Sequence, residues 1–124
     1  MNVLLWILQC LLAILFFATG LMKTIQPIDR LADKMGWVHD ASPFAVRTAG
    51  VAEILASLSL LFPAMFGVVE ILTPMAAIGL GQIMVLAIPL HVRRDELGMV
   101  GLNVLLLALL GVIAAGRLME GSAG

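Results

Sequence analysis

The chain alternates between long apolar stretches and short polar connections. A helix needs roughly 20 apolar residues to cross about 30 Å of hydrocarbon. Four stretches reach this length, at about residues 3–22, 44–62, 73–92 and 97–115. The pattern therefore predicts an all-α integral membrane protein, a four-helix antiparallel bundle in which residues 1–124 form a single domain.

Helix-breaking residues mark the connection between the second and third predicted spans. Pro63 and Gly67 favour a tight turn there. Pro74 suits the first turn of a helix, where its missing N–H costs little, so Thr73 and Pro74 indicate the start of the third span. The alternative is a helix that begins near Val68 and is kinked at Pro74.

The connection at residues 23–45 carries a different pattern. After Pro27, apolar residues recur at the spacing of one helix face, and charged residues occupy the other face. The apolar set is Ile28, Leu31, Ala32 and Met35, and the charged set is Asp29, Arg30, Asp33 and Lys34. We expect an amphipathic helix at about residues 27–36, lying along the membrane surface with Trp37 at headgroup level. A solvated loop of mixed charge is the alternative.

Basic residues are unevenly distributed over the connections. The first connection and its flanks contain Lys23, Arg30, Lys34 and Arg47, the third contains Arg93 and Arg94, and the C-terminal tail contains Arg117. The second connection has none. Because cytoplasmic loops are enriched in Lys and Arg, residues 23–45 and 93–96 are predicted to face the cytoplasm and both termini to lie outside.

Composition supports the membrane prediction and excludes several functions. The chain is 62% hydrophobic and 12% charged, with a mean hydropathy of +1.13, whereas soluble domains are about 45–50% apolar and about 25% charged. A net charge of −1 provides no basic surface, so no nucleic-acid partner is expected. Cys10, the single cysteine, excludes an intramolecular disulfide. His39 and His91 lack a metal-ligand spacing, so no metal site is expected.

A carboxylate lies inside the second predicted span. Ionisable residues in spans are costly and usually face the bundle interior or a cavity. Glu53 shares one helix face with small residues, which allow close approach of neighbouring helices. That face comprises Ala49, Ala52, Glu53 and Ala56, with Ser57 beside it. We therefore expect Glu53 to point into the bundle.

Other polar residues fall at a matching depth. The predicted topology places Lys23, His91 and Asn103 in the same cytoplasmic half as Glu53. Lys23, Glu53, His91 and Asn103 are therefore the expected ligand-binding residues. The sequence assigns no catalytic residue, and Glu53 is the best candidate for one. Gln82 is a secondary candidate. It precedes His91 by nine residues and so lies on roughly the opposite side of an ideal helix, unless Pro89 distorts the span.

Structural readings of the same residues remain open. A buried carboxylate must be paired or protonated, because an isolated charge in a medium of low dielectric is costly. The polar cluster could serve only to specify helix packing. Individually, Lys23 could extend to the headgroups, His91 could be an interfacial residue, and Asn103 could hydrogen-bond between helices.

At these residues the sequence resembles the DoxX/DoxX-like family of small four-helix membrane proteins. The matching segments are FFATGLMK, RTAGVAEILASLSLLFP, LAIPLHVRRDE and GLNVLLLAL. The family's named member is a subunit of a thiosulfate:quinone oxidoreductase, and relatives are linked to quinone-related and thiol-stress redox functions. The resemblance implies a quinone-associated or redox-accessory role, and it carries over Lys23, Glu53, His91 and Asn103 as site positions.

Three functions follow as hypotheses. The first is binding of an amphipathic, quinone-like molecule at the intrabundle polar site, without a covalently bound cofactor. The second is a structural or assembly subunit of a membrane complex. The third is a small transporter of metabolites or protons. The expected partners are the lipid bilayer, of the bacterial inner-membrane type, and a homo-oligomer or a redox partner protein.

Overall fold

The computed structural model describes residues 2–36, 38, 41–67 and 71–123. In this part of the chain the helices are α1 Asn2–Ile25, α2 Ile28–Lys34, α3 Pro43–Phe66, α4 Leu72–Arg93 and α5 Leu97–Ala123. All except α2 are long and apolar enough to cross a membrane. The predicted all-α fold with four membrane-length helices is therefore confirmed. Trp37 and His39 lie outside the described residues.

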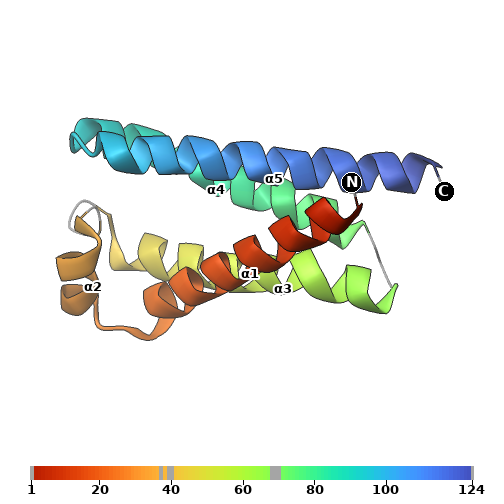
Figure 1. Cartoon of the computed structure of the whole chain (residues 1–124). Helices are drawn as coiled ribbons and strands as arrows, with labels where there is room; N and C mark the ends of the chain where they lie inside the picture. The colour runs from red at the N-terminus through yellow and green to blue at the C-terminus, as the bar shows by residue number, and fades with distance from the viewer. Residues whose placement is uncertain (1, 37, 39–40, 68–70, 124) are drawn as a thin grey trace.

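The long helices form two layers (Figure 1). One layer contains α1 and α3, which pack along each other, and the other contains α4 and α5. The end at which α1 begins and α5 ends is opposite the end that carries α2 (Figure 1). A Cβ atom built on Gly36 would lie 2.7 Å from the Arg94 side chain, so the first and third connections meet. Both basic connections therefore lie at one end of the bundle.

The short helix α2 packs at that end. Leu31 and Ala32 are buried with Val46 of α3, whereas Asp29 and Asp33 are exposed. The predicted amphipathic segment is therefore a helix whose apolar face covers the start of α3, and the alternative of a solvated loop is excluded. Helix α3 itself begins with a cap, because the Ser42 hydroxyl accepts a hydrogen bond from the N–H of Ala45.

The turn between the second and third spans was predicted at Pro63 and Gly67, and only the Gly67 part of this prediction is correct. Helix α3 continues through Pro63 and ends only at Gly67, whose φ of 65° is the left-handed conformation that glycine adopts without strain. Proline has no N–H to donate to the carbonyl oxygen of Ser59, four residues earlier. The hydroxyl of Thr73 in α4 donates to that oxygen instead, at 3.1 Å. A tertiary contact thus supplies the missing hydrogen bond.

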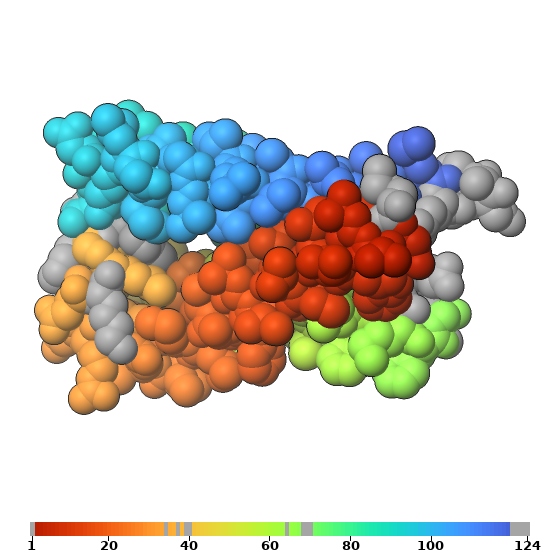
Figure 2. Space-filling view, viewed as in Figure 1, coloured from red at the N-terminus to blue at the C-terminus, as the bar shows by residue number. Residues whose placement is uncertain are grey.

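An apolar core joins the two layers. Phe16, Leu60, Leu80, Leu106 and Leu110 are among its buried members. The outer faces of the spans carry many exposed large apolar side chains, as expected for contact with lipid. Figure 2 shows that the surfaces of α1 and α5 meet toward the chain ends and separate toward α2.

Candidate functional site

Helices α1 and α3 cross at two glycines. A Cβ atom on Gly20 would lie 2.8 Å from the carbonyl oxygen of Gly50, and a Cβ atom on Gly50 would lie 2.9 Å from that of Gly20. Each glycine precedes a charged residue by three positions, in GLMK and GVAE. Residues three apart share a helix face. The close crossing therefore brings Lys23 of α1 against Glu53 of α3.

Lys23 and Glu53 form a buried ion pair. The Lys23 ammonium lies 3.0 Å from each carboxylate oxygen of Glu53 and donates a well-directed hydrogen bond to Oε1. Glu53 is 1% exposed and Lys23 9%. Glu53 thus points inward as expected, and Lys23 turns to it rather than extending to the headgroups. The Oε2 atom of Glu53 accepts no well-directed hydrogen bond from the described residues.

Arg47 fixes the end of α1 beside this pair. Its guanidinium donates to the carbonyl oxygen of Lys23 at 2.8 Å. This oxygen belongs to the last turn of α1, where carbonyls have no partner within the helix. The backbone that carries Lys23 is therefore held against α3 independently of the ion pair.

His91 has a partner that the sequence analysis missed. Its Nδ1 atom lies 2.9 Å from Oε1 of Glu96, and its ring is 4% exposed. The contact spans the connection between α4 and α5, in which Asp95 has a φ of 59° and the N–H of Glu96 donates to the carbonyl oxygen of His91. A spacing of five residues matches no regular helix face, so the sequence alone did not indicate this pair.

Asn103 is buried in α5 and is 4% exposed. Its Nδ2 atom has no hydrogen-bond acceptor among the described residues. Such a group is uncommon, since most buried polar atoms in proteins are satisfied by protein or by ordered water. Asn103 and Glu53 thus contribute one spare donor and one spare acceptor to the interior of the bundle.

The four sequence-predicted residues are all buried, and each lies on the α2 side of the apolar core of its helix. Each lies on the buried face of its helix, one or two turns from a residue of the apolar core, toward the end of the bundle that carries α2. The corresponding steps are Phe16 to Lys23, Leu60 to Glu53, Met84 to His91 and Leu106 to Asn103. Each of the four spans therefore contributes a buried polar residue to this half of the bundle, and we call these four residues the polar layer. Within it, the structure pairs Lys23 directly with Glu53, and His91 with Glu96.

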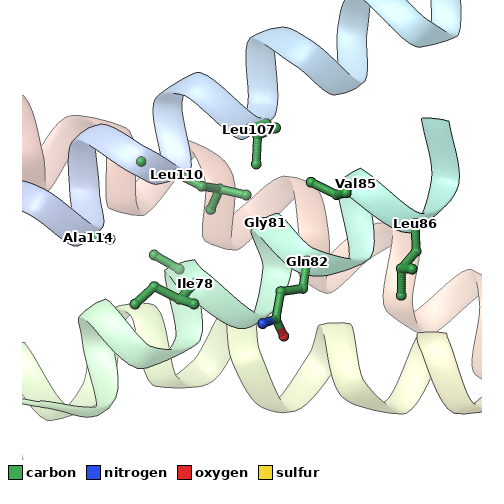
Figure 3. Close-up of a pocket in the computed structure, with 10 residues that line it drawn as sticks. Ile78, Gly81, Gln82, Val85, Leu86, Leu107, Leu110 and Ala114 are labelled. Atoms are coloured by element: carbon green, nitrogen blue, oxygen red, sulfur yellow. The ribbon is translucent and has the colours of Figure 1, made fainter.

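Gln82 lies elsewhere. Its side chain is exposed on the outside of α4, where it lines a groove between α4 and α5 (Figure 3). His91 of the same helix is buried. Gln82 and His91 therefore lie on different sides of α4, as an ideal helix predicts, even though Pro89 lies within this helix. Gln82 does not belong to the polar layer.

A second polar network lies near the chain ends and was not foreseen. Gln9 is fully buried and donates from Nε2 to the carbonyl oxygen of Leu60 at 2.6 Å. Arg117 donates to Oε1 of Gln9 at 2.6 Å and to the side chain of Asn2 at 2.7 Å. The guanidinium also lies over the ring of Trp6. Arg117, expected in a tail, thus belongs to α5 and joins it to α1.

Comparison with known proteins gives one match. A model of the DoxX-like family aligns with residues 7–113, which include the polar layer and the four spans except their outermost residues. No curated protein and no solved structure matches the chain.

Proposed function

The chain belongs to the DoxX-like family, and from this premise we propose that it binds an amphipathic, lipid-soluble molecule whose polar head contacts the polar layer. The integral membrane location follows from the family and from four membrane-length apolar helices. A quinone is the candidate ligand class, and Lys23, Glu53 and Asn103 are the proposed head-group contacts.

The observation that carries this proposal is unsatisfied hydrogen-bonding capacity among the buried residues of the polar layer. Among the described residues, Asn103 Nδ2 has no hydrogen-bond acceptor, and Glu53 Oε2 accepts no well-directed hydrogen bond beyond its 3.0 Å ionic contact with the Lys23 ammonium. Burying a polar group in hydrocarbon without a hydrogen-bond partner costs about 2–7 kcal/mol of free energy. A carbonyl oxygen of a quinone would accept from Asn103 or from the Lys23 ammonium, and a hydroxyl of the reduced form would donate to Glu53.

The proposed role is that of a redox-associated accessory subunit. Glu53 is the residue best placed to exchange a proton with a bound head group, because it is the buried carboxylate of the polar layer. In this role the chain would work beside a redox partner protein or as a homo-oligomer. We further propose that residues 23–45 and 93–96 face the cytoplasm of a bacterial inner-membrane type of bilayer, since these connections share one end and carry most basic residues.

One observation favours a second candidate, a structural subunit. The Gly20–Gly50 crossing and the Lys23–Glu53 pair together fix how α1 and α3 align. Buried polar pairs can specify helix register without binding anything. In that case the unsatisfied atoms would have no ligand, and removal of the carboxylate charge would affect only stability.

Ligand occupancy in matched variants distinguishes the two. Wild type, Glu53→Gln and Ser57→Ala would be purified in mild detergent and compared by native mass spectrometry, organic extraction and thermal unfolding. Ser57 is a matched control, because it is buried one turn from Glu53 and, within the described part of the chain, its hydroxyl bonds only to the carbonyl oxygen of Ile54 in its own helix.

We expect a lipid-soluble molecule to copurify with wild type and Ser57→Ala and to be lost from folded Glu53→Gln. Lost thermal stability with unchanged occupancy in the folded fraction would refute ligand binding by Glu53 and support the structural role.

A further inference from the structure

A groove runs along the outer face of the α4–α5 layer (Figure 3). It has a volume of about 540 Å³ and is almost entirely apolar. Its walls include Ala77, Gly81 and Gln82 of α4 and Leu107, Gly111 and Ala114 of α5. Exposed residues, among them Ile78, Gln82 and Leu86, form the rim of the groove, and buried residues of the apolar core, among them Ala77 and Leu110, form its floor.

Gln82 is the exception to the apolar character of this groove. It stands midway along α4, which spans Leu72–Arg93, and its side chain is exposed. Figure 3 shows the amide at the edge of the groove, turned away from Leu107. Within the part of the chain that the structure describes, the amide makes no hydrogen bond. At this depth a membrane offers no water, so both its donor and its acceptor need a protein partner.

The surroundings of Gln82 allow another helix to come close. Gly111 is exposed on the α5 wall, where a Cβ atom would meet nothing within 4 Å, whereas Gly81 on the α4 wall is buried against Leu107. Small residues at an exposed helix surface let two backbones approach, which brings short polar side chains within hydrogen-bond distance. An acyl chain of a lipid would fill the apolar groove but would leave the Gln82 amide unsatisfied.

We propose that this groove is the interface of a symmetric dimer, in which the Gln82 amides of two copies hydrogen-bond to each other. All copies share one membrane orientation, so a two-fold axis along the membrane normal places any residue at the same depth as its counterpart. A glutamine amide is self-complementary, because it both donates and accepts. A second copy of the chain thus offers, at the same depth in the membrane, an amide that can both donate to and accept from Gln82. The proposal is independent of ligand binding at the polar layer.

Cysteine cross-linking tests the geometry. In a Cys10→Ser background, Gln82→Cys and Leu105→Cys would each be oxidised in membranes with copper phenanthroline. Leu105 is a matched control, since it is exposed on the side of α5 away from the groove, two residues before Leu107, which meets Gly81. We expect a disulfide-linked dimer for Gln82→Cys and at least fivefold less for Leu105→Cys. Equal cross-linking of both, or cross-linking of Gln82→Cys to a different protein alone, would overturn the proposal.

The energetic contribution of the amide is tested separately. Gln82→Leu keeps the size of the side chain and removes its hydrogen bonds. Interhelical hydrogen bonds in membranes are of modest strength. Because the variant loses two of them, its dimerisation constant should be roughly fivefold to tenfold lower than that of wild type. Single-molecule photobleaching in bilayers measures this dimer fraction, with Leu105→Ala expected to match wild type. A wild-type protein that remains monomeric, or a Gln82→Leu protein that dimerises as wild type does, would refute the interface.

Discussion

Gly20 of α1 and Gly50 of α3 touch backbone to backbone, so that a Cβ atom on either would lie within 3 Å of the other's carbonyl oxygen. This crossing determines where the charged residues one turn away can meet. Lys23 and Glu53 lie 3.0 Å apart because their helices approach at these glycines. The ion pair and the glycine contact are thus two parts of one interhelical arrangement.

Gly50→Ala is expected to destabilise the bundle. The added methyl group would lie 2.7 Å from the Thr24 hydroxyl and 2.8 Å from Cβ of Lys23, so α1 and α3 must separate. Overpacking of this kind costs about 1–3 kcal/mol. Thermal unfolding in detergent measures the effect. Gly101→Ala is the control, because a Cβ atom there meets nothing within 4 Å and alanine favours helix. Equal stability of both variants would contradict the close crossing.

Removing one member of the ion pair is expected to cost more than removing both. Lys23→Met leaves the Glu53 carboxylate buried without its cation, which corresponds to about 3–5 kcal/mol in comparable buried pairs. The double variant Lys23→Met/Glu53→Gln contains no uncompensated charge and should recover most of the loss. Chemical unfolding of the four proteins of this cycle gives the coupling. Additive effects of the two changes would show that the residues do not interact.

Arg117→Met is expected to destabilise the end of the bundle near the chain ends. The change removes the donor to Oε1 of fully buried Gln9, and an unsatisfied buried acceptor costs about 1–3 kcal/mol. Arg93→Met serves as the charge-matched control, because Arg93 is exposed at the other end of the bundle. Thermal unfolding should separate the two variants. A loss of stability in Arg93→Met as large as in Arg117→Met would point to a general effect of net charge.

Topology is testable by labelling of single cysteines. In a Cys10→Ser background, Asp33→Cys on α2 should resist a membrane-impermeant maleimide in intact cells and react after permeabilisation. Met119→Cys, exposed near the end of α5, should react from outside. These results follow from the basic residues that share one end of the bundle. Efficient labelling of Asp33→Cys in intact cells would reverse the orientation.

Much of the architecture was accessible from the sequence because hydrocarbon imposes a simple rule. Every backbone polar group must be satisfied within the segment, so apolar length predicts the spans. The small-residue face around Glu53 also predicted its inward orientation. Depth along the helices then placed Lys23 in the same half of the bundle, and the structure pairs the two at 3.0 Å.

The remaining features depend on contacts between distant segments. Gln9 and Arg117 meet only because the start of α1 lies against the end of α5. Glu96 reaches His91 because the chain reverses at Asp95 with a positive φ, a conformation that aspartate adopts only occasionally. Pro63 predicts a turn by local preference, but Thr73 replaces the hydrogen bond that proline cannot make. Local pattern carries no information on such partners.

The hydroxyl of Thr73 also bears on how the protein assembles. If α3 entered the bilayer alone, the carbonyl oxygen of Ser59 would sit in hydrocarbon without a donor, because Pro63 cannot supply one. Pairing with α4 removes that penalty, because Thr73 donates to this oxygen. Insertion of α3 and α4 together, as a helical hairpin, is therefore favoured over stepwise entry, because Pro63 near the end of α3 leaves a carbonyl oxygen that Thr73 of α4 satisfies.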